Sequence, residues 1–238
     1  MGGAAPSADS ASPVASLRNV AKAYRRGLGE VLALCDVSLR VAPGEFLAVM
    51  GPSGSGKSTL LAILGCLDRP TSGEYALGGL RVLDLDDAAT SRLRNRTIGF
   101  VFQSFHLIPE LSVVENVETP LLYGACPPRE WRSRALALLD KVGLSHRAEH
   151  RPSELSGGEA QRAAIARALV TEPRILLADE PTGNLDSATG EDVARLLTGL
   201  HGEGRTVILV THNEGLGRRA ERMIHLRDGR IEAEERPA

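Results

Sequence analysis

Hydrophobic and polar positions change their spacing along the chain, and each change predicts a different kind of element. Short apolar runs separated by turns over residues 17–41 predict a small antiparallel sheet. Residues 46–50 form a continuous apolar run, which is typical of a buried strand. A stripe of leucines at helical spacing follows it: Leu60, Leu61, Leu64 and Leu67. The chain is therefore expected to begin with antiparallel strands and to continue with a buried strand and a helix.

The middle of the chain predicts a hairpin and then a block of helices. Residues 73–83 have the pattern of a hairpin, with Gly78-Gly79 at its turn. Between residue 105 and about residue 170 the spacing of apolar residues becomes helical. One predicted helix carries a clear apolar stripe: Trp131, Ala135, Leu138, Leu139 and Val142.

The last third of the chain alternates strands with a helix. Apolar runs at residues 175–178 and 206–210 predict strands, and a final hairpin is expected around Asp228-Gly229. The helix between the two strands is marked by Val193, Leu196, Leu197 and Leu200. Alternating strands and helices predict a mainly parallel sheet. The helical block interrupts this pattern and is expected to form a separate lobe.

Composition narrows the class of protein. The 238 residues, 42% of them hydrophobic, suffice for one large α/β domain or two small ones. The formal net charge of −2 gives no electrostatic basis for binding nucleic acid, so no nucleic-acid partner is expected. The 3 cysteines include no CxxC pair, which favours a reducing cytosol and no zinc site.

The chain shows neither a predicted membrane span nor a signal peptide. No apolar run approaches the ~18 residues that a spanning helix needs. Residues 1–16 are rich in Ala, Ser and Pro, and they lack a basic start followed by an apolar segment. They are expected to form a disordered tail.

The segment between the first buried strand and its helix reads GPSGSGKST and fits the phosphate-loop pattern G-x-x-x-x-G-K-[ST]. Its glycines allow the backbone amides to wrap around phosphate oxygens at a helix N-terminus. Lys57 is expected to bridge the β- and γ-phosphates, and Ser58 to bind Mg²⁺. A chance Gly/Ser-rich loop is the alternative, but the strand-to-helix context favours nucleotide binding. The nucleotide-binding residues are Gly51, Pro52, Ser53, Gly54, Ser55, Gly56, Lys57, Ser58 and Thr59.

Two acids follow the predicted strand at residues 175–178. A buried strand in an open α/β sheet delivers Asp179 to the edge where ligands bind. We expect Asp179 to hold the Mg²⁺ shell and Glu180 to polarise the attacking water. Their side chains are expected to point in opposite directions, because neighbouring residues of an extended strand do so. Alone, two adjacent acids after a strand more often mark only the start of a helix; the upstream phosphate loop favours catalysis.

A second phosphate-binding device is predicted at residues 155–159, which read LSGGE and precede a helix. Ser156 and Glu159 fit a helix capping box. A capping box does not need consecutive glycines, which weaken a helix. They are explained if backbone amides and the Ser156 hydroxyl contact a phosphate. The residues concerned are Leu155, Ser156, Gly157, Gly158 and Glu159.

Taken in order, the phosphate loop, LSGGE, LLADE, Asn184-Leu185-Asp186 and Thr211-His212 resemble the nucleotide-binding subunit of an ATP-binding cassette (ABC) transporter. The resemblance covers nearly all of residues 17–238. It implies an α/β fold with a RecA-like P-loop NTPase core, an antiparallel β subdomain and an inserted helical subdomain at about residues 105–165. It also implies ATP and Mg²⁺ as ligands, and phosphate binding by the LSGGE segment in trans, across a head-to-tail homodimer.

The resemblance assigns four further residues. Tyr24 matches the aromatic residue that stacks on adenine, although an aromatic residue is also ordinary in a strand. Gln103 matches the glutamine that contacts Mg²⁺ and the attacking water. Asp186 matches the loop that crosses to the other subunit and is also suited to cap a helix. His212 matches the histidine that hydrogen-bonds the γ-phosphate, so Glu180, His212 and Gln103 form the catalytic set.

Two residues depart from the commonest family pattern. Glu159 stands where glutamine is more usual, and it preserves the capping box. Asn213 stands where aspartate is more usual, which leaves His212 intact.

Within the family, the likeness is to the group of the lipoprotein-release ATPase LolD and the macrolide-exporter ATPase MacB. The EPTGNLD segment at residues 180–186 and the IGFVFQ segment at residues 98–103 are similar to that group. Residues 142–155 and the length of the chain are closest to LolD. The implied function is the ATP-hydrolysing motor that drives lipoprotein release from the inner membrane toward the outer membrane. A peptide or antibiotic exporter and a cell-division signalling ATPase are alternatives, and a soluble DNA-repair or translation ATPase is disfavoured.

The partners implied by the resemblance are a second ATPase subunit and integral membrane permease subunits. The protein would then lie peripherally on the cytoplasmic face of the inner membrane. The helical lobe around Phe105, Leu107 and Ile108 is the expected docking surface, although these residues are also suited to a core.

Overall fold

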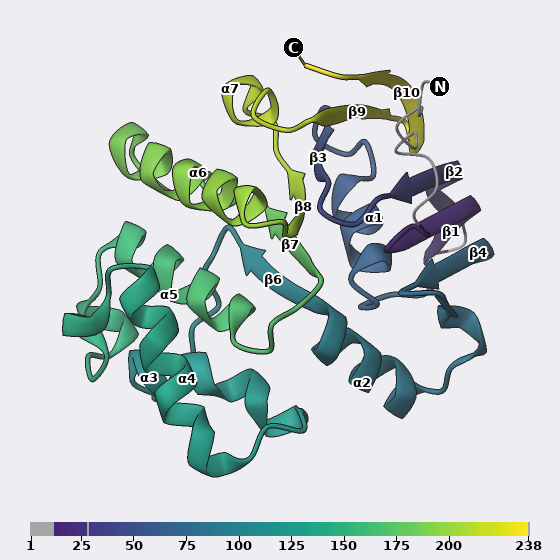
Figure 1. Ribbon diagram of the computed structural model, residues 1–238. Coiled ribbons are helices and arrows are strands. Elements are labelled where there is room, and N and C mark those ends of the chain that lie inside the picture. The colour runs from purple at the N-terminus through teal and green to yellow at the C-terminus, as the bar shows by residue number, and fades with distance from the viewer. Residues whose placement is uncertain (1–11, 28, 238) are drawn as a thin grey trace, which may run out of the picture.

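The computed structural model describes residues 12–27 and 29–237. It contains a six-stranded sheet with helices on both faces, a four-stranded antiparallel sheet beside it, and a lobe of helices (Figure 1). Within the described residues, no helix combines the length and the apolar character needed to cross a bilayer.

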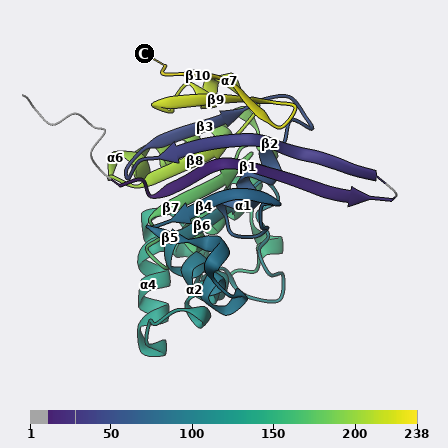
Figure 2. The same ribbon diagram turned by 90° about the vertical axis from the view of Figure 1, so that its right-hand side faces the viewer.

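The antiparallel sheet confirms the pattern predicted for the start of the chain. It consists, in spatial order, of β2 (Gly29–Val41), β1 (Ala15–Arg26), β4 (Ser72–Leu77) and β5 (Leu80–Arg81). The hairpin of β4 and β5 turns at Gly78-Gly79, as predicted. Figure 2 shows the long β1–β2 hairpin reaching out past the other strands.

The prediction of a disordered tail over residues 1–16 is wrong for its last residues. β1 begins at Ala15, and the buried Val14 donates its amide hydrogen to the Val41 carbonyl oxygen at 2.8 Å. These residues join the sheet because they pair with β2 and β4, which a local reading of composition does not reveal. The rest of the expected tail, residues 1–11, lies outside the described residues.

The larger sheet is mainly parallel, as predicted. Its order is β10 (Arg230–Glu235), β9 (Arg222–Arg227), β3 (Phe46–Met50), β8 (Thr206–Val210), β7 (Ile175–Asp179) and β6 (Ile98–Phe102). Only β10 runs antiparallel to its neighbour, and it forms the predicted hairpin with β9. Asp179 at the end of β7 is paired with Phe102 on one side and Val210 on the other. The carboxyl ends of three strands therefore meet at one edge.

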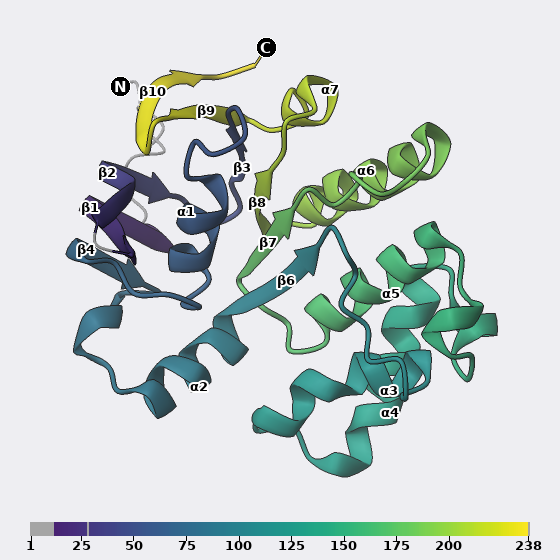
Figure 3. The ribbon, with the colours of Figure 1, turned by 180° about the vertical axis from the view of Figure 1, so that it is seen from behind.

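Helices cover opposite faces of this sheet, as Figure 3 shows from behind. Ile175 and Leu177 of β7 join the hydrophobic core that contains α1 (Lys57–Leu64). Leu176 and Ala178 join the core that contains α5 (Gly157–Leu169) and α6 (Ser187–Gly202). Because alternate strand residues face opposite sides, α1 lies on one face and α5 and α6 lie on the other.

The predicted leucine stripe is correct only as far as the end of α1. Leu60, Leu61 and Leu64 are buried, whereas Leu67 is 52% exposed. The helix ends at Leu64, and Cys66 takes a left-handed conformation with φ of 52°. The chain therefore turns away before Leu67 can reach the helical face.

The helical lobe contains α3 (Val113–Glu118), α4 (Pro128–Lys141) and α5, with short 3-10 turns η3 (Thr119–Tyr123), η4 (Ser145–Arg147) and η5 (Pro152–Glu154). The predicted stripe on α4 contributes to the core of this lobe. The lobe is not separate from the sheet, because α5 is shared: a Cβ on Gly99 of β6 would lie 2.2 Å from the Ala168 carbonyl oxygen. The remaining helical segments are η2 (Val82–Asp84), α2 (Asp87–Thr97) and α7 (Glu214–Gly217).

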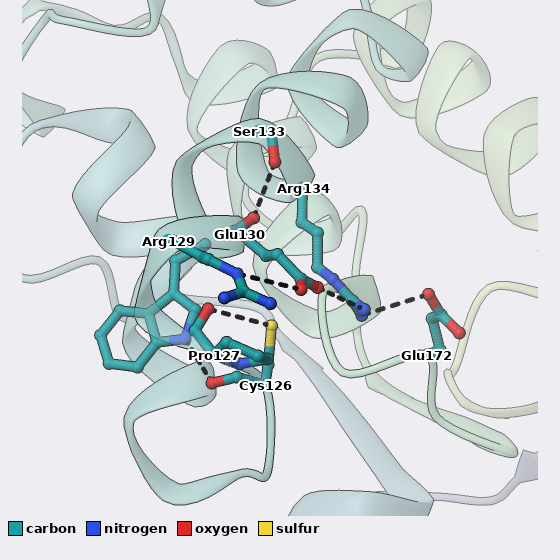
Figure 4. A network of polar contacts seen from close by, with 8 residues as sticks. Cys126, Pro127, Arg129, Glu130, Ser133, Arg134 and Glu172 are labelled. Carbon is teal, nitrogen blue, oxygen red and sulfur yellow. Dashed lines mark hydrogen bonds and ion pairs between the residues drawn. The ribbon is translucent and has the colours of Figure 1, made fainter.

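Arg134 of α4 pairs with one acid of its own helix and with one acid of the loop that precedes β7 (Figure 4). Arg134 contacts Glu130 one turn earlier at 3.3 Å and Glu172 beyond α5 at 3.5 Å. These side chains are largely solvated, so each pair contributes at most ~1 kcal/mol.

Candidate nucleotide site

The phosphate loop has the backbone that the sequence motif predicts. Gly51, Gly54 and Gly56 have φ of 150°, 80° and 103°. Residues that carry a Cβ rarely adopt such positive φ angles. A Cβ on Gly51 would lie 2.1 Å from the Leu226 carbonyl oxygen. Glycine is therefore required both for the turn and for its close approach to the neighbouring strand.

The polar groups of this loop fit a bound phosphate chain. Lys57 begins α1, and its ammonium donates to the carbonyl oxygens of Gly51 and Pro52 at 2.7 and 2.8 Å. The Ser55 hydroxyl is buried and has no hydrogen-bond partner within the described residues. A buried hydroxyl without a partner costs stability, and a phosphate oxygen would satisfy it. Ser58 is exposed and Thr59 half-buried in the first turn of α1.

The two acids after β7 occupy different environments, but not for the predicted reason. Asp179 ends the strand, whereas Glu180 has a left-handed φ of 44° and does not extend it. The expectation that strand alternation separates the two side chains is therefore wrong. Burial raises the pKa of Asp179, the adjacent Glu180 raises it further, and Lys57 opposes both. A cation beside Asp179 would remove this penalty, which fits the predicted Mg²⁺ ligand.

The Glu180 carboxylate is held by two residues that follow β8. Its Oε2 accepts from the Thr211 hydroxyl at 3.1 Å, and its Oε1 lies 2.7 Å from Nδ1 of His212. The Glu180 side chain is 17% exposed and that of His212 is 74% exposed. The arrangement places a carboxylate at the sheet edge with an imidazole beside it, open to solvent.

Gln103 lies just beyond β6 and contacts the loop after Glu180. Its Nε2 donates to Oδ1 of Asn184 at 3.0 Å, and the Asn184 amide returns a bond to the Gln103 carbonyl oxygen at 3.1 Å. The structure thus brings Gln103 to the same loop as Glu180. Its contact with Mg²⁺ and water stays a prediction.

The LSGGE segment forms the predicted capping box at the start of α5. Ser156 and Glu159 exchange backbone and side-chain hydrogen bonds. Leu155 is half-buried against the core of the lobe. Gly157 is exposed, but a Cβ on Gly158 would lie 2.1 Å from the Thr189 methyl carbon. At Gly158 the contact between α5 and α6 is therefore a second reason for glycine, and contact of the two glycines with a phosphate stays a prediction.

Glu159 carries an unusually acidic carboxyl group. The Ser156 amide is the strongest of the groups that lower its pKa to about 2, with help from the Ser156 hydroxyl and from Arg147 against the effect of burial. Arg147 donates to it at 3.0 Å. Glu159 carries a negative charge that the more usual glutamine lacks, and Arg147 of the same chain balances it.

Asp186 and Tyr24 each make contacts in the structure that suit an ordinary structural role. Asp186 caps α6, accepting from the amides of Ala188 and Thr189 at 3.1 Å. Tyr24 lies on β1, is 39% exposed, and donates its hydroxyl hydrogen to Asp68. Their predicted contacts with the other subunit and with adenine stay predictions.

Several residues of the site have roles that local sequence reasoning missed. Thr211 and Asn184 were only letters within motifs, yet they hold Glu180 and Gln103. Asp68 lies outside the motifs, and Arg147 lies in the run at residues 142–155 but was given no role there. The available signal was weak: a polar residue directly after a buried strand for Thr211, and an unmatched charge at Glu159 for Arg147.

The two segments that are predicted to bind phosphate lie on opposite faces of the sheet. The phosphate loop leads into α1 on one face, and LSGGE leads into α5 on the other. In Figure 1, β6 and β7 run between these two helices.

Comparison with known proteins places these features in a family. The family model described as ABC transporter matches residues 34–183. The uncharacterized ABC transporter ATP-binding protein YvrO of Bacillus subtilis is 50% identical over 221 residues, which cover 93% of this chain and 96% of that protein. The macrolide export ATP-binding/permease protein MacB of Rhodospirillum rubrum is 52% identical over 232 residues, covering 97% of this chain. The chain corresponds to 36% of the length of that MacB.

A solved structure of the same architecture is also similar. The dimeric, post-hydrolysis state of the ATP-binding cassette MJ0796, bound to ADP and Pi, has a TM-score of 0.87 and 48% sequence identity. The match covers 94% of this chain and 99% of that chain.

Proposed function

The chain belongs to the ABC transporter family, and we propose that it works as a homodimer that closes head to tail around ATP to drive a membrane permease. The predicted ABC ATPase fold is confirmed, and the chain is an ATP-binding motor and an ATP hydrolase. The arrangement of the dimer, the residue roles, Mg²⁺, the permease and the transported substrate are the parts that we propose.

One observation carries the dimer: the two segments that we propose to bind phosphate lead into helices on opposite faces of the sheet. Because the sheet separates α1 from α5, we infer that the two segments serve different phosphate chains within one subunit. A second copy in the opposite orientation would bring Ser156 of one subunit to the phosphate loop of the other. The dimeric assembly of MJ0796 supports this arrangement.

The residues on the sheet edge divide the work of phosphoryl transfer, which needs positioning and charge neutralisation. Lys57, Ser55 and the loop amides would hold the phosphates. Ser58, Asp179 and Gln103 would hold Mg²⁺, whose charge offsets that of the phosphates. Glu180 would then take a proton from the attacking water.

His212 has a second task beside this carboxylate. Its Nδ1 contacts Glu180, so its other ring nitrogen is available for the γ-phosphate. ATP would favour the closed dimer because it contacts both subunits at once, and hydrolysis would return the population to the open state.

The permease is expected to dock in a groove between the sheet and the helical lobe. This groove of about 710 Å³ is lined by aromatic residues and by arginines: Phe100, Phe102, His106, Tyr123, Arg94 and Arg167. Tyr123, which lines the groove, is 72% exposed, and its neighbour Leu122 is 59% exposed. We infer that the occupant is an amphipathic helix of a membrane permease, since MacB joins ATP-binding and permease parts in one protein.

The predicted docking surface around Phe105, Leu107 and Ile108 is revised here. Leu107 packs against the core of the lobe, Phe105 is half-buried, and Ile108 is 39% exposed. Leu107 therefore serves the core, and the docking surface moves to the neighbouring groove.

For the transported substrate, two candidates have support. The LolD-like run at residues 142–155 supports lipoprotein release from the inner membrane, which we keep as the first proposal. The 52% identity to MacB supports export of a macrolide-type compound. Identifying the membrane proteins that co-purify with the chain, and then testing which substrate stimulates ATP hydrolysis by the complex, separates the two.

Mixing two inactive variants tests the shared site. Lys57→Ala disables the phosphate loop, and Ser156→Arg blocks the opposing device. In a heterodimer of the two, both changes fall on one composite site and the other stays intact, so mixing should restore hydrolysis. Hydrolysis that stays absent after mixing, in heterodimers shown to form, would contradict the proposal.

A matched control places both changes in one chain. Each composite site of a heterodimer between that double variant and the unmodified chain carries one change. Adding the double variant should therefore lower the ATP hydrolysis of the unmodified protein.

A further inference from the structure

Tyr24 is held in place by a carboxylate that lies 44 residues further along the chain. Its hydroxyl donates to Oδ2 of Asp68 at 2.7 Å. The ammonium of Lys22 donates to Oδ1 of the same carboxylate at 2.5 Å. Asp68 thus accepts hydrogen bonds from two side chains of β1, and both of its oxygens are used.

Asp68 is itself fixed to the helix that follows the phosphate loop. Its backbone amide donates to the Ala62 carbonyl oxygen at 3.2 Å, and its Oδ1 also accepts from the Arg69 amide at 2.7 Å. The bonds from Asp68 to β1 therefore link Tyr24 to α1, whose first residue is Lys57. A displacement of Asp68 would move the tyrosine relative to the phosphate loop.

The charge of Asp68 is stable in this environment. Burial alone would raise its pKa, but hydrogen bonds from Lys22, Tyr24 and the Arg69 amide outweigh that effect and lower the pKa. The side chains of Lys22 and Asp68 are 13% and 30% exposed. The carboxylate is therefore ionised at neutral pH and available as an acceptor for the phenol.

Lys22 covers one face of the Tyr24 ring. Its ammonium lies over the ring at 4.8 Å from the centroid. Both residues lie on β1, where the pairing with β2 is irregular between Lys22 and Ala23. With one ring face covered by a cation, a planar base has the opposite face on which to stack.

We propose that Asp68 is a positioning residue that holds the Tyr24 ring in the orientation that stacks on the nucleotide base, with Lys22 covering its other face. The inference depends on the proposed function, because it requires that ATP binds at the phosphate loop and that Tyr24 contacts its base. If the contacts served only to join β1 to α1, their loss would affect stability and leave base recognition unchanged.

The test compares a ligand that has a base with one that lacks it. Affinities for Mg-ATP and for inorganic tripolyphosphate are measured by titration calorimetry for Asp68→Ala and the unmodified chain. Asp68→Ala should bind ATP about three- to tenfold more weakly, the scale of one lost hydrogen bond, and tripolyphosphate equally well. In turnover, KM for ATP should rise by a similar factor while kcat changes less than twofold.

A second background shows whether the effect passes through the ring. In a Tyr24→Ala chain, adding Asp68→Ala should cause no further loss of ATP affinity, because no ring remains to be positioned. An equal loss in both backgrounds, or an equal loss for ATP and tripolyphosphate, would overturn the proposal.

Two controls keep the outcomes distinct. Asp36 also accepts from a β1 side chain, Asn19, at 2.7 Å, so Asp36→Asn is matched to Asp68→Asn and should not change ATP affinity. Asp68→Asn replaces Asp68→Ala if the latter does not fold, and an ATP affinity equal to that of Asp36→Asn would then overturn the proposal. Failure of the unmodified chain to bind either ligand would instead contradict the nucleotide site itself.

Discussion

At the scale of single residues, Glu180 combines an unfavourable backbone with a well-held side chain. A left-handed conformation costs a residue other than glycine roughly 1–2 kcal/mol, and Glu180 has φ of 44°. Its amide donates to the Val210 carbonyl oxygen at 2.8 Å, which fixes the turn against β8. Its carboxylate then meets Thr211 and His212, which follow that strand. The neighbouring strand thus stabilises a conformation that the local sequence does not favour.

We predict that Thr211→Val lowers ATP hydrolysis by about tenfold while ATP affinity stays within twofold. The substitution keeps the size of the side chain and removes a donor to Glu180 Oε2, so the carboxylate loses part of its orientation. Steady-state turnover and equilibrium binding measure the two quantities. Thr206→Val is the control. Thr206 is buried like Thr211, but its hydroxyl oxygen accepts from the Gly44 amide and does not contact Glu180. An equal loss of turnover in both variants would assign the effect to stability.

A second residue-scale prediction concerns Glu159 and pH. Its pKa is lowered from 4.5 to about 2 in the folded protein, so the ionised carboxylate favours folding at any pH above about 4.5. That contribution is lost as the pH falls from 4.5 toward 2. Glu159→Gln should therefore reduce the free energy of unfolding at pH 7 by about 1 kcal/mol, and by less at pH 3.5.

Urea unfolding at pH 7, 5 and 3.5 measures this difference. Arg147→Met removes the arginine that pairs with Glu159, and in that background the Glu159→Gln effect should be smaller. If the difference in unfolding free energy between the unmodified chain and Glu159→Gln stayed constant or grew on acidification, the pKa assignment would be contradicted.

At the scale of elements, the periodicity of apolar residues predicted nearly every strand and helix that builds the site. The apolar runs of strands β3, β7 and β8 and the stripe on α4 could be predicted because burial imposes their patterns. Errors arose where a contact distant in sequence decides the local conformation. Pairing of Ala15 with β2 and β4 orders the end of the expected tail, and the left-handed Cys66 takes Leu67 off the helix.

The contact between α5 and α6 gives an element-scale prediction at Gly158. A Cβ there would lie 2.1 Å from the Thr189 methyl carbon, and Thr189 cannot rotate away freely because its hydroxyl bonds Asp186 at 2.6 Å. Gly158→Ala should therefore lower the free energy of unfolding by about 1–3 kcal/mol, measured by urea denaturation. Gly157→Ala is the matched control, since Gly157 is exposed, and it should cost less. Equal effects of the two substitutions would mean that the helices do not meet as described.

At the scale of the whole molecule, the sequence predicted a set of residues for the chemistry but not how they meet. The phosphate loop and the capping box could be predicted because each lies within one short segment. The bonds between Gln103 and Asn184, 81 residues apart, and between Tyr24 and Asp68 depend on the order of strands in the sheets. A local pattern carries no record of that order, so the residues that support the site were found only in the structure.

The two segments that are predicted to bind phosphate lie on opposite faces of the sheet, which leads to our central proposal, a head-to-tail ATP dimer that hydrolysis reopens. Glu180→Gln tests it most directly, because glutamine keeps the size of the side chain and removes the basic carboxylate. Binding of ATP should survive, and hydrolysis should fall by roughly 10²-fold or more, the scale of lost general-base assistance. Size-exclusion chromatography with Mg-ATP should then show a stable dimer that is absent with ADP. Near-normal turnover in Glu180→Gln, or a variant that stays monomeric with saturating Mg-ATP, would contradict the account.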